Sequence, residues 1–357
     1  MSTECTVAAM GARGCPLDDR NMPIVPVHPK HRLCAAVVGA VMLVTLASCG
    51  DDDDEARAAT TSTEADAPST TAAVATTAAA ESGGLLRLEV LGGPDWLAAD
   101  DRYVYVKRDD GYVDQIDPDT NEVVASVEVG GELCQGMGVG FDAVWTCRNT
   151  DVARVDFETG RVETTIPLGK ASVQGTLPAG FDRIWVLLGD GGQLTGIDPT
   201  TNVADPPIEL GVRGTDVAVA DDGVWVASSP DGAVVRVDPA TRAVTARFDG
   251  LDRPSALAVG DDVWAGGAST TVRIDPTSGT VIDTIEIGVG LDGALALDGT
   301  SLWIRNAADF LQHVDTETGA VEMISADAPS GGDVLVAFGS VWASAYNDAA
   351  LFRLPLP

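Results

Sequence analysis

The stretch that decides the fold is residues 217–248, VAVADDGVWVASSPDGAVVRVDPATRAVTARF. It contains four short segments rich in apolar and β-branched residues, at Val217–Ala220, Val224–Ala227, Ala233–Val237 and Ala243–Phe248. Apolar and polar side chains alternate along these segments, which is typical of β-strands. The gaps between them are short enough for hairpins. The stretch therefore predicts four antiparallel strands joined in chain order.

This unit recurs seven times, and each copy has one aromatic residue in its second strand. The aromatic residues are Tyr105, Trp145, Trp185, Trp225, Trp264, Trp303 and Trp342, spaced by 40, 40, 40, 39, 39 and 39 residues. Four-stranded units of about 40 residues are typical of propeller blades. The sequence predicts an all-β, seven-bladed β-propeller with four antiparallel strands per blade; a solenoid of stacked units is the weaker alternative. We expect the aromatic residues to pack between neighbouring blades.

A turn motif follows the third strand of the first six units. It has Asp at its first position, at Asp117, Asp156, Asp198, Asp238, Asp275 and Asp315, and the fourth residue after each Asp is Asn121, Gly160, Asn202, Arg242, Gly279 or Gly319. Asp accepts hydrogen bonds from nearby backbone N–H groups, and Gly or Asn suits a left-handed backbone that closes the turn. Only Arg242 departs from this pattern, at the cost of a positive φ in a larger residue.

The ends of the repeated region predict how the ring closes. The seventh unit stops at Pro357 after three strands. The missing fourth strand has a match near the other end, where Leu88-Glu89-Val90 resembles the fourth-strand segment Val127-Glu128-Val129. We expect residues 85–91 to pair beside the last strand, which would cover an open sheet edge.

Residues 116–130, IDPDTNEVVASVEVG, resemble the repeats of YVTN-type β-propeller proteins, and the units are also similar to those of the seven-bladed streptogramin (virginiamycin B) lyases. The resemblance spans about residues 85–357. Similarity to the lyases implies a magnesium-dependent site with histidines and an acid on one face. Within the repeats the sequence offers only His313, at a variable position of a third strand. We assign no catalytic residue, and a lyase or another propeller enzyme with a site on its top face stays the alternative function.

The N-terminus predicts export and lipid anchoring. Leu33–Ser48 is an apolar run of 16 residues after Lys30, His31 and Arg32, as in a signal peptide, and it is short for a membrane-spanning helix. Leu46-Ala47-Ser48-Cys49 resembles the lipobox of bacterial lipoproteins, which implies lipidation of Cys49; an uncleaved anchor is the alternative. We predict a signal peptide at 1–48, with 1–21 an extension from a misplaced start codon, a lipidated Cys and disordered linker at 49–84, and the propeller at 85–357. The expected location is the extracytoplasmic face of the cell membrane.

The formal net charge of −32 argues against nucleic-acid binding, which needs a basic surface. We expect a monomer and predict no cofactor and no metal site. Cys134 and Cys147 flank the first hairpin of the second unit, and pairing of its strands would bring them together. Because the compartment is oxidising, we predict a disulfide between them; two buried thiols are the alternative.

Basic residues give the one indication of a ligand. One set shares a repeat position in the third strand and consists of Arg154, Arg236, Arg273 and Arg353. A second set does not follow the repeat, and we assign it to the loops between second and third strands and to the loops entering each blade. It consists of Lys107, Arg108, Arg148, Lys170, Arg213, Arg253 and Arg305. In a propeller these loops share the face around one mouth of the central channel, and loops on a rigid scaffold often carry binding residues. Arginines there would suit a carboxylate or phosphate; ion pairing with nearby aspartates is the alternative. The sequence thus predicts a surface-exposed binding module for an anionic small molecule or a protein partner.

Overall fold

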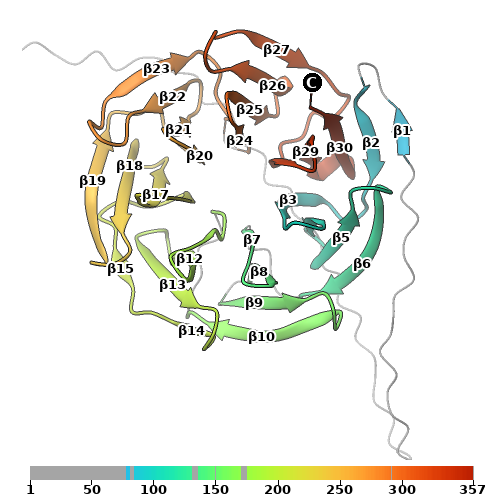
Figure 1. The fold of residues 1–357 in the computed structure, drawn as a ribbon, viewed down its shortest axis with the longest axis horizontal. Helices are drawn as coiled ribbons and strands as arrows, with labels where there is room; N and C mark the ends of the chain where they lie inside the picture. Colours follow the sequence, from blue (N-terminus) through green and yellow to red (C-terminus); the bar gives the residue numbers. More distant parts are fainter. Residues whose placement is uncertain are drawn as a thin grey trace, which may run out of the picture. The chain divides into compact units, whose positions relative to one another are not determined.

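The computed structural model describes residues 78–80, 84–130, 136–148, 150–169, 175–290 and 292–356. Within them, seven antiparallel sheets are arranged around a common axis, each running from an inner strand to an outer strand at the perimeter (Figure 1). This confirms the predicted seven-bladed β-propeller with four antiparallel strands per blade. The predicted signal peptide and Cys49 lie outside the described residues.

Blades 1 to 4 follow one another along the chain. From the axis outward, blade 1 has β3 (Pro94–Ala99), β4 (Val104–Arg108), β5 (Tyr112–Asp117) and β6 (Glu122–Glu128), and blade 2 has β7 (Met137–Gly140), β8 (Ala143–Arg148), β9 (Asp151–Asp156) and β10 (Arg161–Pro167). Blade 3 has β11 (Ala179–Gly180), β12 (Arg183–Leu188), β13 (Gln193–Asp198), β14 (Val203–Ala204) and β15 (Ile208–Glu209). Blade 4 has β16 (Asp216–Ala220), β17 (Gly223–Ser228), β18 (Ala233–Asp238) and β19 (Ala243–Asp249). In blade 3 the outer strand is divided into β14 and β15. Pro206 and Pro207 lie in the gap, and proline has no N–H to donate to the ladder.

Blade 7 takes its outer strand from the other end of the repeated region. The strands of blades 5 to 7 are β20 (Ala256–Val259), β21 (Val263–Gly266), β22 (Thr271–Ile274) and β23 (Val281–Ile285); β24 (Ala294–Asp298), β25 (Ser301–Asn306), β26 (Phe310–Asp315) and β27 (Val321–Ile324); and β28 (Val334–Ala337), β29 (Ser340–Ala345), the 3₁₀ turn η2 (Tyr346–Asp348), β30 (Ala350–Pro355) and β2 (Leu86–Glu89). Leu86 pairs with Arg353 and Glu89 with Ala350, so the predicted closure is confirmed. A further short strand, β1 (Ala78–Ala80), pairs with the outer side of β2.

The hydrophobic core consists of seven clusters, and each cluster joins two neighbouring blades. Trp342 of blade 7, for example, packs with Leu97 and Val104 of blade 1, and Trp225 of blade 4 packs with Leu257 of blade 5. The six tryptophans of the repeat are each at most 2% exposed. This confirms that the repeated aromatic residues pack between blades, where the loss of one such ring costs about 3–5 kcal/mol.

The third-strand arginines pack on tryptophans, and Arg154, Arg236 and Arg353 also contact the next blade. In four blades the arginine lies over the tryptophan of the adjacent strand, with guanidinium-to-ring distances of 5.2 Å for Arg154–Trp145, 5.5 Å for Arg236–Trp225, 5.6 Å for Arg273–Trp264 and 4.8 Å for Arg353–Trp342. Arg154 Nη1 also donates to the Pro199 carbonyl of blade 3 at 2.8 Å. Arg353 Nη1 likewise donates to Asn121 Oδ1 of blade 1 at 2.7 Å. The Asp-Pro turns are therefore also acceptors for the preceding blade.

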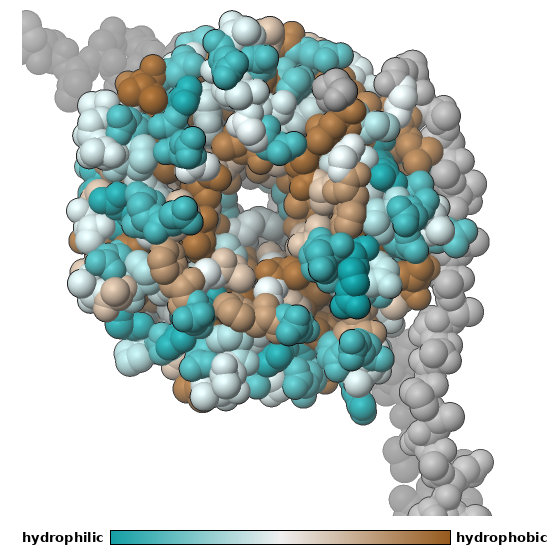
Figure 2. All heavy atoms as spheres, viewed as in Figure 1, coloured by the Kyte–Doolittle hydropathy of each residue, from teal (hydrophilic) through white to brown (hydrophobic). Residues whose placement is uncertain are grey.

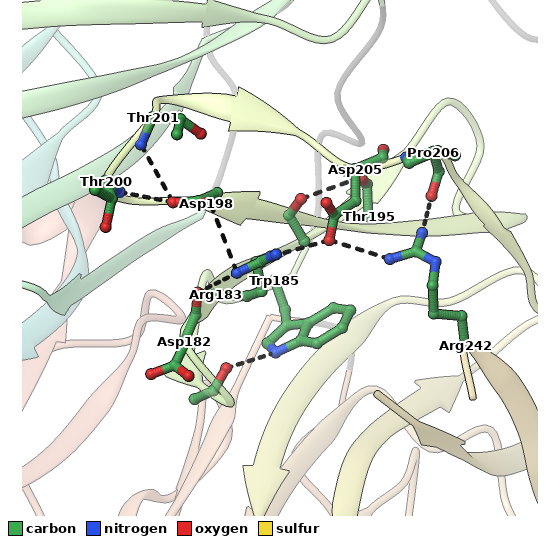
Figure 3. Close-up of polar contacts among 12 residues, drawn as sticks. Asp182, Arg183, Trp185, Thr195, Asp198, Thr200, Thr201, Asp205, Pro206 and Arg242 are labelled. Carbon is green, nitrogen blue, oxygen red and sulfur yellow. Dashed lines mark hydrogen bonds and ion pairs between the residues drawn. The ribbon is translucent and has the colours of Figure 1, made fainter. Parts of the chain in front are cut away.

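Blades 3 and 4 use a different contact. Gly196 replaces the third-strand arginine of blade 3, and Arg183 fills the space beside it. Arg183 Nε and Arg242 Nη1 both contact Asp205 Oδ2, at 3.0 and 3.1 Å (Figure 3). The predicted left-handed turn is confirmed at all six positions: Asn121 (φ 62°), Gly160 (66°), Asn202 (55°), Arg242 (57°), Gly279 (71°) and Gly319 (72°). At Arg242 the contact with blade 3 offsets the cost of a positive φ.

The axis of the ring is open. Figure 2 shows the opening framed mainly by hydrophobic residues, with hydrophilic residues more frequent toward the perimeter. Because consecutive strands of a blade are antiparallel, the loops entering each blade and the loops between second and third strands lie at one mouth of this channel. The Asp-Pro turns lie at the opposite mouth.

Candidate ligand-binding site

A cavity of about 300 Å³ lies at the mouth where the inner strands begin. Six blades contribute to it: its lining residues are Asp95, Trp96, Gly175, Thr215, Ser229, Pro230, Arg253, Ser255, Asp292, Gly293, Ala294, Gly332, Asp333 and Tyr346. Both kinds of loop expected at this face are present, since Arg253 precedes β20 whereas Ser229 lies between β17 and β18. Cavities of this size are in the range of small-molecule sites.

Four of the basic residues assigned to loops lie in second strands instead, so that placement is wrong for them. Lys107 and Arg108 end β4, Arg148 ends β8, and Arg305 lies within β25. Lys107 and Arg305 each stand two positions after the repeated aromatic residue. The sequence contained this offset, and counting from the aromatic residue would have placed both in the strand.

Arg305 is fully buried, and its guanidinium is bonded to the backbone. It donates to the carbonyls of Ser344, Ser330 and Phe310, at 3.0, 2.7 and 3.1 Å. Burial lowers the pKa of Arg305 to about 10. Arg305 has no exposed surface, and its hydrogen bonds join blades 6 and 7.

Lys107 is also buried, between blades 1 and 2. Its ammonium donates to the Cys147 carbonyl at 3.3 Å. Burial lowers the pKa of Lys107 to about 8, against the attraction of Asp95 and Asp109. Lys107 is therefore a buried cation that Asp95 and Asp109 attract by charge, rather than a surface cation.

Arg108 and Arg148 are only partly exposed, and both form local ion pairs. Arg108 contacts Asp110 and Asp114 at 2.7 and 3.0 Å, and Arg148 contacts Asp151 at 2.7 Å. These are the local ion pairs that the sequence left open as the alternative.

Arg213 and Arg253 differ from these two arginines. Both are exposed, and neither side chain forms an ion pair or hydrogen bond with a described residue. Only Arg253 lines the cavity. Lys170 lies outside the described residues. Ligand binding by these basic residues stays a prediction, centred on Arg253.

Three carboxylates line the cavity, and the sequence analysis did not select them. Asp95 stands at the start of β3, Asp292 precedes β24 and Asp333 precedes β28. Burial and the charge of Asp109 raise the pKa of Asp95 to about 6, while Lys107 opposes this shift. The carboxylates of Asp95 and Asp292 accept no hydrogen bond from a described residue, so both are available to a ligand.

Asp333 has a structural partner in addition to its place in the lining. Its Oδ2 accepts the Leu97 N–H of blade 1 at 2.9 Å and its Oδ1 accepts the Val334 N–H at 2.8 Å. Burial raises its pKa to about 7. Asp216 of blade 4 makes the same kind of contact, since its carboxylate accepts the Leu257 N–H of blade 5 at 2.9 Å. Both aspartates stand nine positions before a repeated tryptophan, a signal that could have been read from the sequence.

The remaining predicted residues lie away from the cavity. His313 stacks on Trp303 with 4.4 Å between ring centroids, and its Nε2 lies 3.0 Å from Ser301 Oγ. Cys147 is buried at the end of β8. Cys134 lies outside the described residues, so the disulfide stays a prediction. In the part of the chain that the structure describes, no three His, Cys, Asp or Glu side chains are placed to hold a metal ion.

Comparisons with known proteins support the fold. No family model matches the chain, and no curated protein matches its sequence. Among solved structures, the Neurospora crassa Pan2 WD40 domain is similar with a TM-score of 0.60 and 12% identity, over 73% of this chain and 88% of that one. The WD40 β-propeller domain of Doa1 is similar with a TM-score of 0.62 and 14% identity, over 74% and 93%. At such identities the likeness shows a shared propeller fold alone.

No helix of the described residues has the length and apolar character needed to cross a membrane.

Proposed function

We propose that the protein is an exported, lipid-anchored binding module of the YVTN type, which holds a ligand or protein partner at the cavity-bearing mouth of its channel. One observation carries the binding proposal. The cavity is built from loops and strand ends of six blades, and it presents Asp95, Asp292 and Arg253, whose side chains have no hydrogen-bonding or ion-pair partners among the described residues. Charged groups held on a rigid scaffold without internal partners are suited to binding.

The alternative of a lyase-type enzyme has no comparable support. His313, the histidine within the described residues, is packed on Trp303 in a third strand and does not line the cavity. The binding proposal needs no reacting group.

Site-specific photo-crosslinking in producing cells tests the location of binding. A benzophenone amino acid is placed at Ser229, in the cavity lining, and in a matched control at Ala240, an exposed residue of the Asp-Pro turn at the opposite mouth. We expect a discrete adduct from position 229 and none from position 240. Equal labelling of both positions, or none at 229, would reject the mouth as the binding surface.

Metabolic labelling with radioactive palmitate tests the anchor. Cys49→Ala should abolish incorporation of the label, because the thiol is the acceptor of the lipid. Cys34→Ala is the matched control, since Cys34 lies within the apolar run rather than after it. Retention of label by the Cys49→Ala protein would contradict lipidation at this residue.

A further inference from the structure

The cavity carries charges of both signs, and they come from different blades. Asp95 belongs to blade 1, Asp333 precedes the inner strand of blade 7 and Asp292 that of blade 6, whereas Arg253 precedes β20 of blade 5. Arg253 contacts none of these carboxylates within 4.0 Å. The acidic and basic groups thus share one cavity without neutralising each other directly.

Arg253 is held in an unusual backbone conformation. Its φ is 52°, in the left-handed region that larger residues rarely adopt, and its N–H donates to the Leu251 carbonyl at 2.9 Å. The neighbouring Asp252 attracts Arg253 by charge, but its carboxylate already accepts Ser269 Oγ and N–H at 2.6 and 2.8 Å. A tight turn that costs backbone energy and presents an uncommitted guanidinium points to a bound anion.

On the opposite side, the Asp95 carboxylate is largely buried and makes no hydrogen bond with a described residue. Asp109 and Asp292 add negative charge to its surroundings, and only Lys107 opposes them. A bound cation would reduce the repulsion of Asp95 by Asp109 and Asp292. Because the described carboxylates, histidines and cysteines form no group of three suited to a metal ion, an organic cation fits better.

Two aromatic side chains complete the lining. Trp96 and Tyr346 are half-buried beside the acidic residues. Aromatic faces attract ammonium groups and also bury apolar parts of a ligand. We propose that the cavity binds a zwitterionic small molecule of the amino-acid or short-peptide class, with its ammonium group at Asp95 and Asp292 and its carboxylate at Arg253. This inference rests on the proposed binding function and specifies its ligand.

Calorimetric titration of the full-length protein in detergent, at pH 7.5, tests this with three probes. The probes are the dipeptide alanylphenylalanine, its N-acetyl form and its C-terminal amide. We expect the free dipeptide to bind, and each blocked form to bind about tenfold or more weakly, since each loses one charge-assisted contact.

Two variants assign the two ends of the ligand. Arg253→Gln should weaken the free dipeptide while leaving the amide unchanged, and Asp95→Asn should weaken the free dipeptide while leaving the N-acetyl form unchanged. Arg213→Gln is the matched control, because Arg213 is an exposed arginine at the corresponding blade entry that does not line the cavity. It should change none of the three affinities. Equal melting temperatures of the variants would show that folding is intact.

The outcomes separate this inference from the proposed function. If the amide binds as tightly as the free dipeptide, the site takes a cation alone and the zwitterion is wrong, while the mouth stays a binding site. If no probe binds, the ligand class is wrong, and the crosslinking at Ser229 decides the proposed function independently. If Arg213→Gln weakens binding as much as Arg253→Gln does, the assignment of Arg253 is overturned.

Discussion

Replacement of Leu88 by alanine should destabilise the whole ring, because Leu88 lies in the strand that closes it. Leu88 is 0% exposed and packs in the cluster between blades 7 and 1, with Trp342 and Leu351. Removal of a fully buried leucine side chain costs about 2–5 kcal/mol, from lost apolar burial and from the cavity left behind. We expect a loss in this range in the free energy of unfolding.

Urea unfolding followed by tryptophan fluorescence measures this loss, since the repeated tryptophans lie in the inter-blade clusters. Val281→Ala is the matched control. Val281 also lies in an outer strand, β23, but it is 46% exposed, and such surface changes stay within about 0.5 kcal/mol. If Leu88→Ala also stays within about 0.5 kcal/mol of the parent protein, β2 does not close the ring as described.

Three further changes test other parts of the structure. Arg305→Met should lower the free energy of unfolding by about 3 kcal/mol or more, because it leaves buried carbonyls without donors. A loss below about 2 kcal/mol, the low end of the range expected for Leu88→Ala, would contradict this role. Asp333→Asn should flatten the pH dependence of the melting temperature: the raised pKa of Asp333 (about 7) means that the folded state binds the proton more tightly, so its stability contribution is present at low pH and is lost as pH rises from about 4 to 7. A variant whose melting temperature still falls like that of the parent between about pH 4 and 7 would refute this. The predicted disulfide between Cys134 and Cys147 should protect both residues from alkylation until a reductant is added, which mass spectrometry of the denatured protein would detect.

Most of the fold could be predicted from the sequence because a propeller is encoded by local repetition. Each blade has its own aromatic residue and each of the first six has its own turn motif, so the number of blades, the inter-blade packing and the closing strand follow from counting. Leu88 was identified as part of the closing strand because its neighbours repeat a segment of blade 1. The split outer strand of blade 3 was not predicted, although Pro206 and Pro207 mark it.

The candidate site was harder to predict because it is formed by residues that share no local pattern. Asp95, Arg253 and Asp292 come from three blades and line one cavity because the blades are arranged in a ring. Basic residues were the predicted ligand contacts because they are few in an acidic chain. The role of each one, however, depends on which groups surround it in the folded ring. Arg305 meets backbone carbonyls and Arg108 meets two aspartates, whereas Arg253 meets neither.

Comparison of equivalent positions in the repeat distinguishes aspartates that join blades from an aspartate that lacks such contacts. Asp216 and Asp333 occupy one repeat position, and each carboxylate bonds to the backbone of the next blade. Asp95 stands beside the corresponding position of blade 1, where the register of β3 shifts between Pro94 and Leu97. That irregularity leaves its carboxylate without the backbone partners of the other two. An irregularity in one strand thus leaves the Asp95 carboxylate without the backbone contacts that Asp333 keeps in the same cavity lining, and such departures from the repeat are where binding residues of a propeller should be sought.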